Sequence, residues 1–486
     1  MKLLWIIPLC IAGALLALPV ILLLIAVIRT IIRGKRVSDY RPVENEEESL
    51  AAAEKLSRMI KYDTTSHAGV SETEKFRGFH KVLEELFPLV HKNLEKTDID
   101  GNLLYFWKGR SDKKPILIMS HQDVVPAEGT WEHAPFSGDI ADGKVFGRGA
   151  ADTKCSVMAF FEAVEELLAE GYTPPVDVYL ASSCTEEWAG DGAPKIVNEL
   201  KRRGADLFLL CDEGGGIIED PIAGINGNFA MVGIFEKGKG DVLFTAESNG
   251  GHASAPSKNS PIARLAAFVN EVETDPPFKK KLLPEVAAMF DTLAPYASFG
   301  LRLVFGNLWL FRPLLVAVMP ALSAQAGAML KTTIAFTVQT GSDAYNVIPQ
   351  KATLGANMRF IPHQGEKESL RIIRNIAEKH GLTTEVLHAN DYTEPVDING
   401  EGYLLFKDVI NETFPGLPVS PYVMTGATDA QFYRDICKNC LRFAPVIYGP
   451  EQMKGMHGLN ENIEYNCLPG AVRFYKNLIK AQERRI

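Results

Sequence analysis

Acidic and imidazole side chains follow three short apolar segments that are predicted to be strands. The carboxyl ends of strands in an open α/β sheet lie at one edge, so these side chains are expected to meet. Imidazole and carboxylate without thiolate form the ligand set of catalytic zinc, which keeps one position open for water. The pattern therefore predicts a catalytic metal site. Its candidate residues are His121, Asp123, Glu186, Glu187, Asp212 and Glu213.

Two further motifs add to this constellation. Asp152 ends the segment GRGAAD at residues 147–152, and His457 lies in MHGLNE at residues 456–461. Three cysteines, Cys155, Cys184 and Cys211, stand beside the motifs. We interpret them as small buried side chains rather than ligands, because carboxylates and imidazoles adjoin them.

In this order, the residues resemble the di-zinc peptidase family that includes aminoacylase, carnosinase and carboxypeptidase S. The resemblance extends from about residue 50 to 480. It is strongest to the branch of carboxypeptidase S and the N-fatty-acyl-amino acid synthase/hydrolase. Three segments suggest that branch, namely HQDVVP at 121–126, EKG at 236–238 and NVIP at 346–349.

The resemblance implies two Zn²⁺ ions per chain with Asp152 shared between them. A shared carboxylate holds two ions about 3.5 to 4 Å apart and offsets their repulsion. Either member of the Asp212–Glu213 pair could be a ligand, and Glu213 is favoured. The implied ligands are His121, Asp152 and Glu213 for one ion, and Asp152, Glu187 and His457 for the other.

Two acidic residues are expected to act beside the ions. Asp123 lies two residues past His121 and would accept the proton on the other ring nitrogen of that histidine. Glu186 adjoins the ligand Glu187 and could reach the attacking water as a general base. The alternative for Glu186 is a solvated surface carboxylate.

The resemblance implies further roles after residue 238. His252, in GGHAS at 250–254, would reach across a homodimer interface to stabilise the developing oxyanion, although alone it would be read as a loop residue. Asn346 and Arg359 would bind the substrate carboxylate, a task that suits a planar guanidinium. Gly426, in TGATD at 425–429, would line the site and allow close backbone approach.

The elements that must position these residues alternate between apolar runs and helical patterns. Runs at 116–119, 176–181 and 207–210 predict a mixed, mostly parallel sheet in an α/β catalytic domain. From residue 239 the pattern changes and predicts a small α+β domain inserted into the first, and the resemblance implies that this is a ferredoxin-like lid and dimerisation domain. The predicted divisions are 1–36 (anchor and basic flank), 37–47 (linker), 48–238 (catalytic), 239–390 (inserted) and 391–486 (catalytic).

The first segment is predicted to be a single-pass membrane anchor. No charged residue occurs from Leu3 to Ile28, and a helix of that length, at about 1.5 Å per residue, exceeds the roughly 30 Å hydrocarbon core. A cleaved signal peptide is the alternative. Four basic residues follow the segment, which favours a cytoplasmic catalytic part. They are Arg29, Arg33, Lys35 and Arg36.

Composition restricts the class of function. The net charge is −9, and no dense Lys/Arg block occurs outside the N-terminal flank, so nucleic acid is not an expected partner.

The predicted activity is hydrolysis of an amide bond beside a free amino-acid carboxylate, in an N-acyl amino acid or a peptide, and the reaction could also run as synthesis. A dipeptidase or carboxypeptidase of ordinary peptides is the alternative, and a non-catalytic receptor would have lost a ligand or Glu186.

Residues 299–327 form an apolar insert that includes Trp309 and Phe311. An ordinary buried helix pair is one interpretation. The other is a trough for a long acyl chain, or a surface that touches the bilayer.

Overall fold

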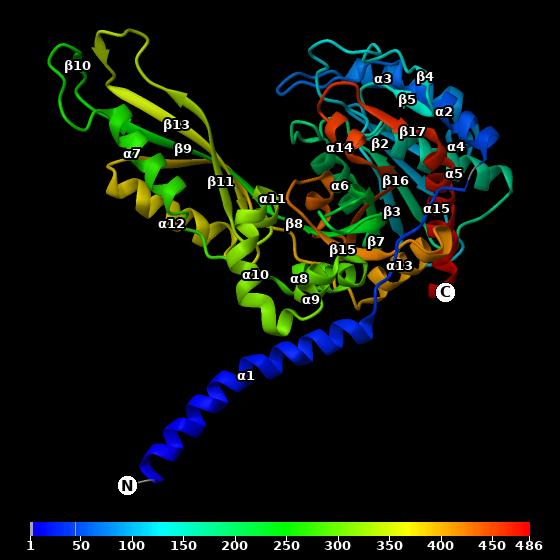
Figure 1. Ribbon diagram of the computed structural model, residues 1–486. Helices are drawn as coiled ribbons and strands as arrows, with labels where there is room; N and C mark the ends of the chain where they lie inside the picture. The colour runs from blue at the N-terminus through cyan, green and yellow to red at the C-terminus, as the bar shows by residue number, and fades with distance from the viewer. Residues whose placement is uncertain (1–2, 44) are drawn as a thin grey trace.

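The computed structural model describes the chain except residues 1, 2 and 44, and it leaves the side chains of residues 3–16 and 322 undescribed. A larger unit surrounds an eight-stranded sheet, and a smaller unit surrounds a four-stranded sheet (Figure 1). The predicted α/β class with a mixed, mostly parallel sheet is confirmed.

The large sheet has the order β1-β2-β6-β3-β7-β16-β8-β15. Strand β3 pairs in parallel with both β6 and β7, β7 with β16, and β8 with β15. The pairs β1–β2, β2–β6 and β7–β8 are antiparallel. The strands are β1 Glu95–Ile99, β2 Asn102–Trp107, β3 Ile116–Met119, β6 Val178–Ser182, β7 Leu209–Glu219, β8 Asn228–Glu236, β15 Val419–Met424 and β16 Cys440–Tyr448.

Both faces of this sheet are covered, which explains the uninterrupted apolar run of β3. Ile116 and Ile118 belong to the core on one face, whereas Leu117 and Met119 belong to the core on the other. Successive side chains of a strand point to opposite faces, so a strand between two helical layers is apolar throughout. Helices on the larger unit include α2 Glu46–Ile60, α3 Thr73–Leu86, α4 Pro88–Asn93, α5 Lys154–Ala169, α6 Gly192–Arg202, α13 Glu401–Thr413, α14 Pro450–Gly455 and α15 Leu468–Lys480. A three-stranded sheet of β4 Ile140–Ala141, β5 Lys144–Phe146 and β17 Asn462–Glu464 lies beside them.

The smaller unit has an antiparallel sheet of order β11-β13-β9-β14 with its own apolar core. Alternate residues of β9 are buried, as expected for a sheet with helices on one face. A two-residue pairing of β10 with β12 forms the far tip in Figure 1. The elements are β9 Gly238–Glu247, β10 Gly251–His252, α7 Pro261–Thr274, β11 Thr333–Thr340, β12 Val347–Ile348, β13 Lys351–Phe360, α12 Gly365–Lys379 and β14 Thr383–Asn390.

One predicted boundary needs correction. Helices α8 Pro284–Leu293, α9 Phe299–Phe305, α10 Leu308–Leu322 and α11 Ala324–Ala328 lie within the range 239–390 that was assigned to the inserted unit. Their buried side chains, Val286 and Leu315 among them, belong instead to the core of the larger unit. Helix α8 packs against β15, so its apolar face is buried by the large sheet rather than the small one.

A second correction concerns β7. The sequence predicted a strand over 207–210 that ends before Asp212, but β7 runs from Leu209 to Glu219. It continues because residues beyond Glu213 pair with β16 on one side and β8 on the other. Asp212 and Glu213 therefore lie within a strand rather than at its end.

The first helix, α1 Leu3–Arg33, extends away from the larger unit (Figure 1). Residues 1 and 2 of the predicted anchor lie outside the described residues, as do the side chains of residues 3–16. Among the residues that the structure describes, no single helix has the length and hydropathy of a membrane span. Helices α9 and α10 meet the criterion together, with a bend of 107° between them.

Candidate metal centre

Asp152 lies between two imidazoles, with one carboxylate oxygen toward each ring. His121 Nε2 is 3.1 Å from Asp152 Oδ1, and His457 Nε2 is 3.1 Å from Asp152 Oδ2. His457 Nε2 is also 3.0 Å from Glu187 Oε2. Ligand atoms of His121, Asp152 and Glu187 lie within 4.8 Å of one another, a spacing that one metal ion can bridge. The structure thus brings together four of the five predicted ligands in direct contact.

The charges of the cluster fit bound cations. Hydrogen bonds to Asp152 and Glu187 raise the pKa of His457 to about 10. Burial raises the pKa of Glu213 well above its usual range, and the nearby carboxylates raise it further. Burial has the same effect on the pKa of Glu186. Such a concentration of buried acids is costly unless positive charge offsets it, which divalent ions among these donors would do.

Asp123 has a different contact with His121 from the one predicted. Nδ1 of His121 lies 2.9 Å from the backbone carbonyl of Asp123 and 3.6 Å from its carboxylate. The carboxylate instead accepts hydrogen bonds from Ser66 Oγ at 2.7 Å and from the backbone N–H groups of Glu186 and Glu187 at 3.2 Å. Asp123 therefore fixes the ring through its main chain and fixes the glutamate pair through its side chain.

The choice between Asp212 and Glu213 is informed by hydrogen bonding. Both oxygens of Asp212 are occupied at 2.9 Å, Oδ1 by the N–H of Glu213 and Oδ2 by the N–H of Ala430. Glu213 lines a cavity beside Asp152. These contacts favour Glu213 as the residue available to a cation.

Glu461 supports the loop that carries Asp152, a role the sequence motif did not suggest. It is fully buried, and its Oε1 accepts hydrogen bonds from the backbone N–H groups of Gly149, Ala151 and Asp152 at 2.9–3.1 Å. Oε2 accepts a hydrogen bond from Arg148 at 2.8 Å. Because Glu461 ends the segment 456–461 that contains His457, it ties the two metal-site loops together.

Replacing Glu461 by Ala is expected to lower the free energy of unfolding by about 3 to 5 kcal/mol, because Arg148 would remain buried without its carboxylate. Urea titration of the variant and the parent measures the difference. Asp435→Ala is the matched control, since it breaks an exposed ion pair with Lys201 and should cost less than about 1 kcal/mol. Equal losses in the two variants would contradict a supporting role for Glu461.

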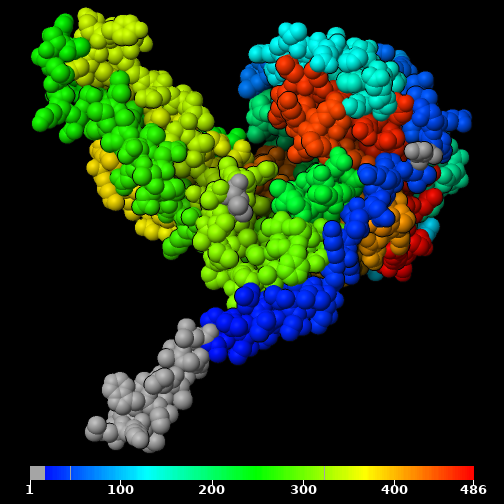
Figure 2. Space-filling model, viewed as in Figure 1, coloured from blue at the N-terminus to red at the C-terminus, as the bar shows by residue number. Residues whose placement is uncertain are grey.

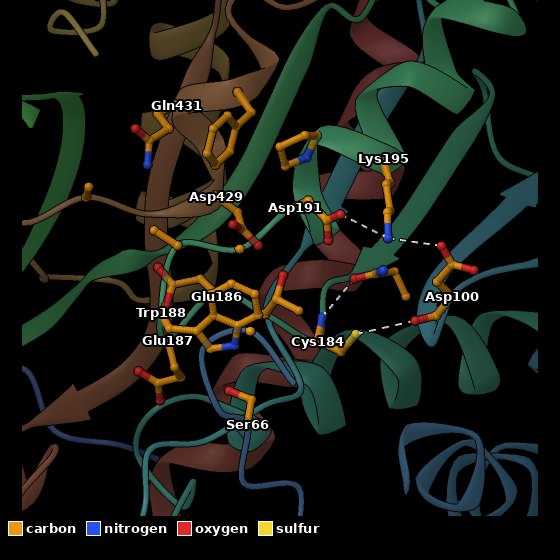
Figure 3. Close-up of a pocket in the computed structure, with 18 of the residues that line it drawn as sticks. Ser66, Asp100, Cys184, Glu186, Glu187, Trp188, Asp191, Lys195, Asp429 and Gln431 are labelled. Atoms are coloured by element: carbon orange, nitrogen blue, oxygen red, sulfur yellow. Dashed lines mark hydrogen bonds and ion pairs between the residues drawn. The ribbon is translucent and has the colours of Figure 1, made fainter. Parts of the chain in front are cut away.

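Two cavities include residues of the cluster in their walls. The first has a volume of about 1080 Å³ and includes Glu186, Glu187 and His457 in its wall. Figure 3 shows the glutamate pair beside Trp188 and near Asp429 in this cavity. The second, of about 920 Å³, includes Asp152 and Glu213, and its wall is otherwise mostly apolar. Residues of the cluster thus line both cavities, and we call the first, which has the more polar wall, the polar cavity and the second the apolar cavity.

The remaining predicted residues divide into two groups. Arg359 and Gly426 line the polar cavity. His252 and Asn346 are exposed at the tip of the smaller unit, where the N–H of Ala253 donates to the Asn346 carbonyl at 2.9 Å. A Cβ at Gly426 would meet no atom within 4 Å, so protein packing does not explain the glycine.

Asp429 is a cavity residue to which the sequence assigned no separate role. Ser183 donates a hydrogen bond to its carboxylate, and burial raises its pKa to about 8. The motif at residues 425–429 contains Asp429, but the resemblance implied a role only for its glycine. Ser66, which supports Asp123, had no signal at all.

Comparisons with known proteins agree with this geometry. Residues 117–481 match the model of peptidase family M20/M25/M40. The chain is 33% identical over 448 residues to a probable carboxypeptidase S-like protein 2 of Dictyostelium discoideum, covering 89% of this chain and 85% of that protein. It is 32% identical over 448 residues to the N-fatty-acyl-amino acid synthase/hydrolase of Homo sapiens, covering 90% and 88%.

Solved structures show the same fold. An M20 family metallo-carboxypeptidase of Sulfolobus solfataricus superposes with a TM-score of 0.65 at 18% identity, covering 90% of this chain and 99% of that one. Human carnosine dipeptidase 1 superposes with a TM-score of 0.62 at 16% sequence identity, covering 91% of this chain and 100% of that one. A Bacillus subtilis protein described as a dinuclear metal-binding peptidase superposes with a TM-score of 0.56 at 13% sequence identity, covering 91% of this chain and 100% of that one. The chain therefore belongs to the metallopeptidase family M20/M25/M40 and is a hydrolase.

Proposed function

We propose that this hydrolase cleaves the amide bond of N-acyl amino acids with long acyl chains. The observation that carries the proposal is that residues of the carboxylate and imidazole cluster line both the polar cavity and the apolar one. An N-acyl amino acid has the same division, with a charged carboxylate on one side of the amide and a hydrocarbon chain on the other. The amide would then lie at the cluster.

Two zinc ions would be held by the five predicted ligands, and Asp152, which contacts both His121 and His457, would be shared between them. When bound, they would polarise the amide carbonyl and lower the pKa of a water molecule. Glu186 lines the polar cavity, and its main chain is held by Asp123. We assign it as the general base that takes the proton of the attacking water and returns it to the leaving amine.

Positive side chains in the polar cavity suit the substrate carboxylate. Arg359 and Lys239 both line it. Arg359 Nε donates to Asn357 Oδ1 at 3.1 Å, which fixes the guanidinium plane. A fixed guanidinium binds a carboxylate through two parallel hydrogen bonds. Asn346, by contrast, would need the smaller unit of a second chain, or a movement of its own, to reach this cavity.

The apolar cavity suits the acyl chain. Helices α9 and α10 supply much of its wall, including Phe305, Leu315 and Met319. Each buried CH₂ contributes roughly 0.8 kcal/mol, so a long chain gains several kcal/mol over an acetyl group. Relatives named for N-fatty-acyl-amino acids support the same substrate class. Trp309 and Phe311 of the same insert do not line this cavity.

We expect kcat/KM to rise from acetyl- to octanoyl- to oleoyl-amino acids when each is assayed below its micelle concentration. Val318→Trp should reduce the ratio of oleoyl to acetyl kcat/KM, because Val318 lines the cavity but is 40% exposed and leaves room for the larger ring. The initial rates of the three substrates give both results. Leu404→Trp on α13, outside the cavity wall, is the control. A flat profile in the parent would favour a peptidase of ordinary peptides, as the carboxypeptidase-like relatives suggest.

Three further features are proposals. The smaller unit would act as the lid and dimerisation domain, with His252 entering the site of a second chain. Helix α1 would hold the enzyme at a membrane, because its sequence has no charge from Leu3 to Ile28. Reversal of the reaction, with a fatty acid and an amino acid in excess, would give synthesis in the same site.

A further inference from the structure

The end of α1 is fixed to the turn between α9 and α10. Asn307 Nδ2 donates to the Ala26 carbonyl at 3.2 Å and to Thr30 Oγ1 at 3.0 Å. Arg33 forms two hydrogen bonds with Asp291 of α8 at 2.7 and 3.0 Å. Figure 2 shows the described part of α1 lying against the residues near position 300. These polar contacts fix the position of the α9–α10 turn along the axis of α1.

This position along α1 coincides with the end of its uncharged, apolar stretch, Leu3 to Ile28. The first charged residue after Leu3 is Arg29, inside the segment that contacts Asn307. Before it, the large apolar side chains of α1 from residue 18 onward are mostly exposed and are 42–57% accessible. They are Leu18, Val20, Ile21, Leu23, Leu24, Ile25 and Ile28.

The α9–α10 pair continues this apolar surface. Phe299 and Trp309 are each 48% exposed, and Leu314 is 53% exposed. Residues 299–327 contain no Asp or Glu, and their only charges are two arginines, Arg302 and Arg312. Tryptophan and arginine without acidic residues is the composition of a segment at the boundary between lipid headgroups and acyl chains. Trp309 Nε1 donates to Asn307 Oδ1 at 3.2 Å, at the level where the apolar stretch of α1 ends.

We propose that the α9–α10 pair lies in the headgroup region of the bilayer beside α1, and that amphiphilic substrates pass from the bilayer into the apolar cavity that the same helices line. This rests on the proposed function for the identity of the substrate. A monomeric N-acyl amino acid with a long chain partitions into lipid rather than water, so a cavity wall placed in the bilayer receives it without the cost of exposing the chain. A second copy of the chain is a weaker candidate for covering this surface. The exposed apolar side chains continue along α1, which extends away from the larger unit, and a bilayer would cover both parts at once.

The first test measures depth. The full chain is placed in nanodiscs of mixed zwitterionic and anionic lipid, with and without lipids that carry a doxyl quencher near the headgroup. The emission of Trp309 is obtained as the difference between the parent and Trp309→Phe, which removes the contributions of the other tryptophans. We expect the shallow quencher to reduce this difference emission. Quenching by aqueous acrylamide instead, with no effect of the doxyl lipid, would overturn the proposal.

The second test measures delivery. Trp309→Glu and Phe299→Glu place a charge on the proposed lipid-facing surface but outside the cavity wall. We expect kcat/KM for oleoyl-amino acid presented in the nanodisc to fall by about tenfold or more, because a carboxylate is unfavourable at this depth. For water-soluble acetyl-amino acid, kcat/KM should stay within about twofold of the parent. Ile140→Glu is the matched control, since Ile140 is 37% exposed on β4, on the opposite side of the molecule from α1 in Figure 1.

The outcomes separate the two proposals. Unchanged oleoyl turnover in both glutamate variants would overturn the delivery route. Loss of a dimer in Trp309→Glu by analytical ultracentrifugation, without doxyl quenching in the parent, would show that a second chain covers this surface. A flat acyl-chain profile combined with doxyl quenching would reject the proposed substrate while leaving the membrane contact in place.

Discussion

Replacing Glu186 by Gln is expected to lower kcat by about 10²- to 10⁴-fold without loss of the two proposed metal ions. The amide has the shape of the carboxylate but cannot accept a proton from water. Glu186 lines the polar cavity beside Glu187, yet it is not among the side chains that contact Asp152. Its position depends on the hydrogen bond from its N–H to Asp123, which the substitution leaves intact. Single-turnover rates and metal analysis of the purified variant measure the two effects separately.

Glu187→Gln is the matched control, because it changes the adjacent residue in the same loop. Its Oε2 lies 3.0 Å from His457 Nε2, so this variant should lose metal as well as rate. Near-parent hydrolysis by Glu186→Gln would rule out the assigned base. Loss of metal in both variants would mean that Glu186 is itself a ligand.

The Glu186→Gln variant also tests whether His252 acts in its own chain or in a second one. In this chain His252 is exposed on β10, at the far tip of the smaller unit (Figure 1). If it acts in a second chain, mixing inactive His252→Ala with inactive Glu186→Gln should restore part of the activity, because a mixed dimer contains one intact site. No recovery after demonstrated subunit exchange would place its role within its own chain or remove it.

The sequence predicted the part of the site that depends on strand ends. Strand β3 was predicted at its observed bounds because four buried residues in a row need helices on both faces. His121 follows it, and Glu187 follows the neighbouring strand β6, so parallel pairing alone brings the two together. The motif order supplied Asp152 and His457, whose loops lie far apart in the chain and meet only through the tertiary fold.

Features that depend on individual hydrogen bonds could not be predicted. The sequence pattern of Asp123 two residues after His121 does not show whether the carboxylate or the carbonyl reaches the ring. Glu461 looked like the end of a histidine motif, because its partners are main-chain N–H groups that have no sequence signal. The apolar helices after residue 283 read as part of the inserted unit since hydropathy shows that a face is buried but not which sheet buries it.

Asp152→Asn should have the largest effect on metal content of any single substitution, because it removes a negative charge from between two imidazoles. Burial raises the pKa of the Asp152 carboxyl, but the hydrogen bonds from His121 and His457 outweigh burial and hold that pKa well below its usual range. In the proposed site Asp152 would hold both ions, so its neutral amide should weaken both sites together rather than one. We expect zinc content after dialysis to fall from two ions per chain toward none, with loss of activity.

Proton competition gives this prediction a second, independent measurement. In the metal-free chain the pKa of His457 is about 10, so at neutral pH a proton occupies a nitrogen that the metal needs. Metal binding must release that proton, and the apparent affinity of the parent should rise by about tenfold per pH unit for each proton released as the pH increases toward 10. Asp152→Asn removes one of the two acceptors that raise the pKa of His457, so the residual metal affinity of this variant should depend less steeply on pH.

Asp139→Asn is the control, since Asp139 also contacts a histidine, His133 at 2.9 Å, but on the surface. Titration with zinc in a competing chelator, repeated at several pH values, distinguishes the variants; an Asp152→Asn chain that kept two ions with the parent's pH dependence would show that Asp152 does not bridge them.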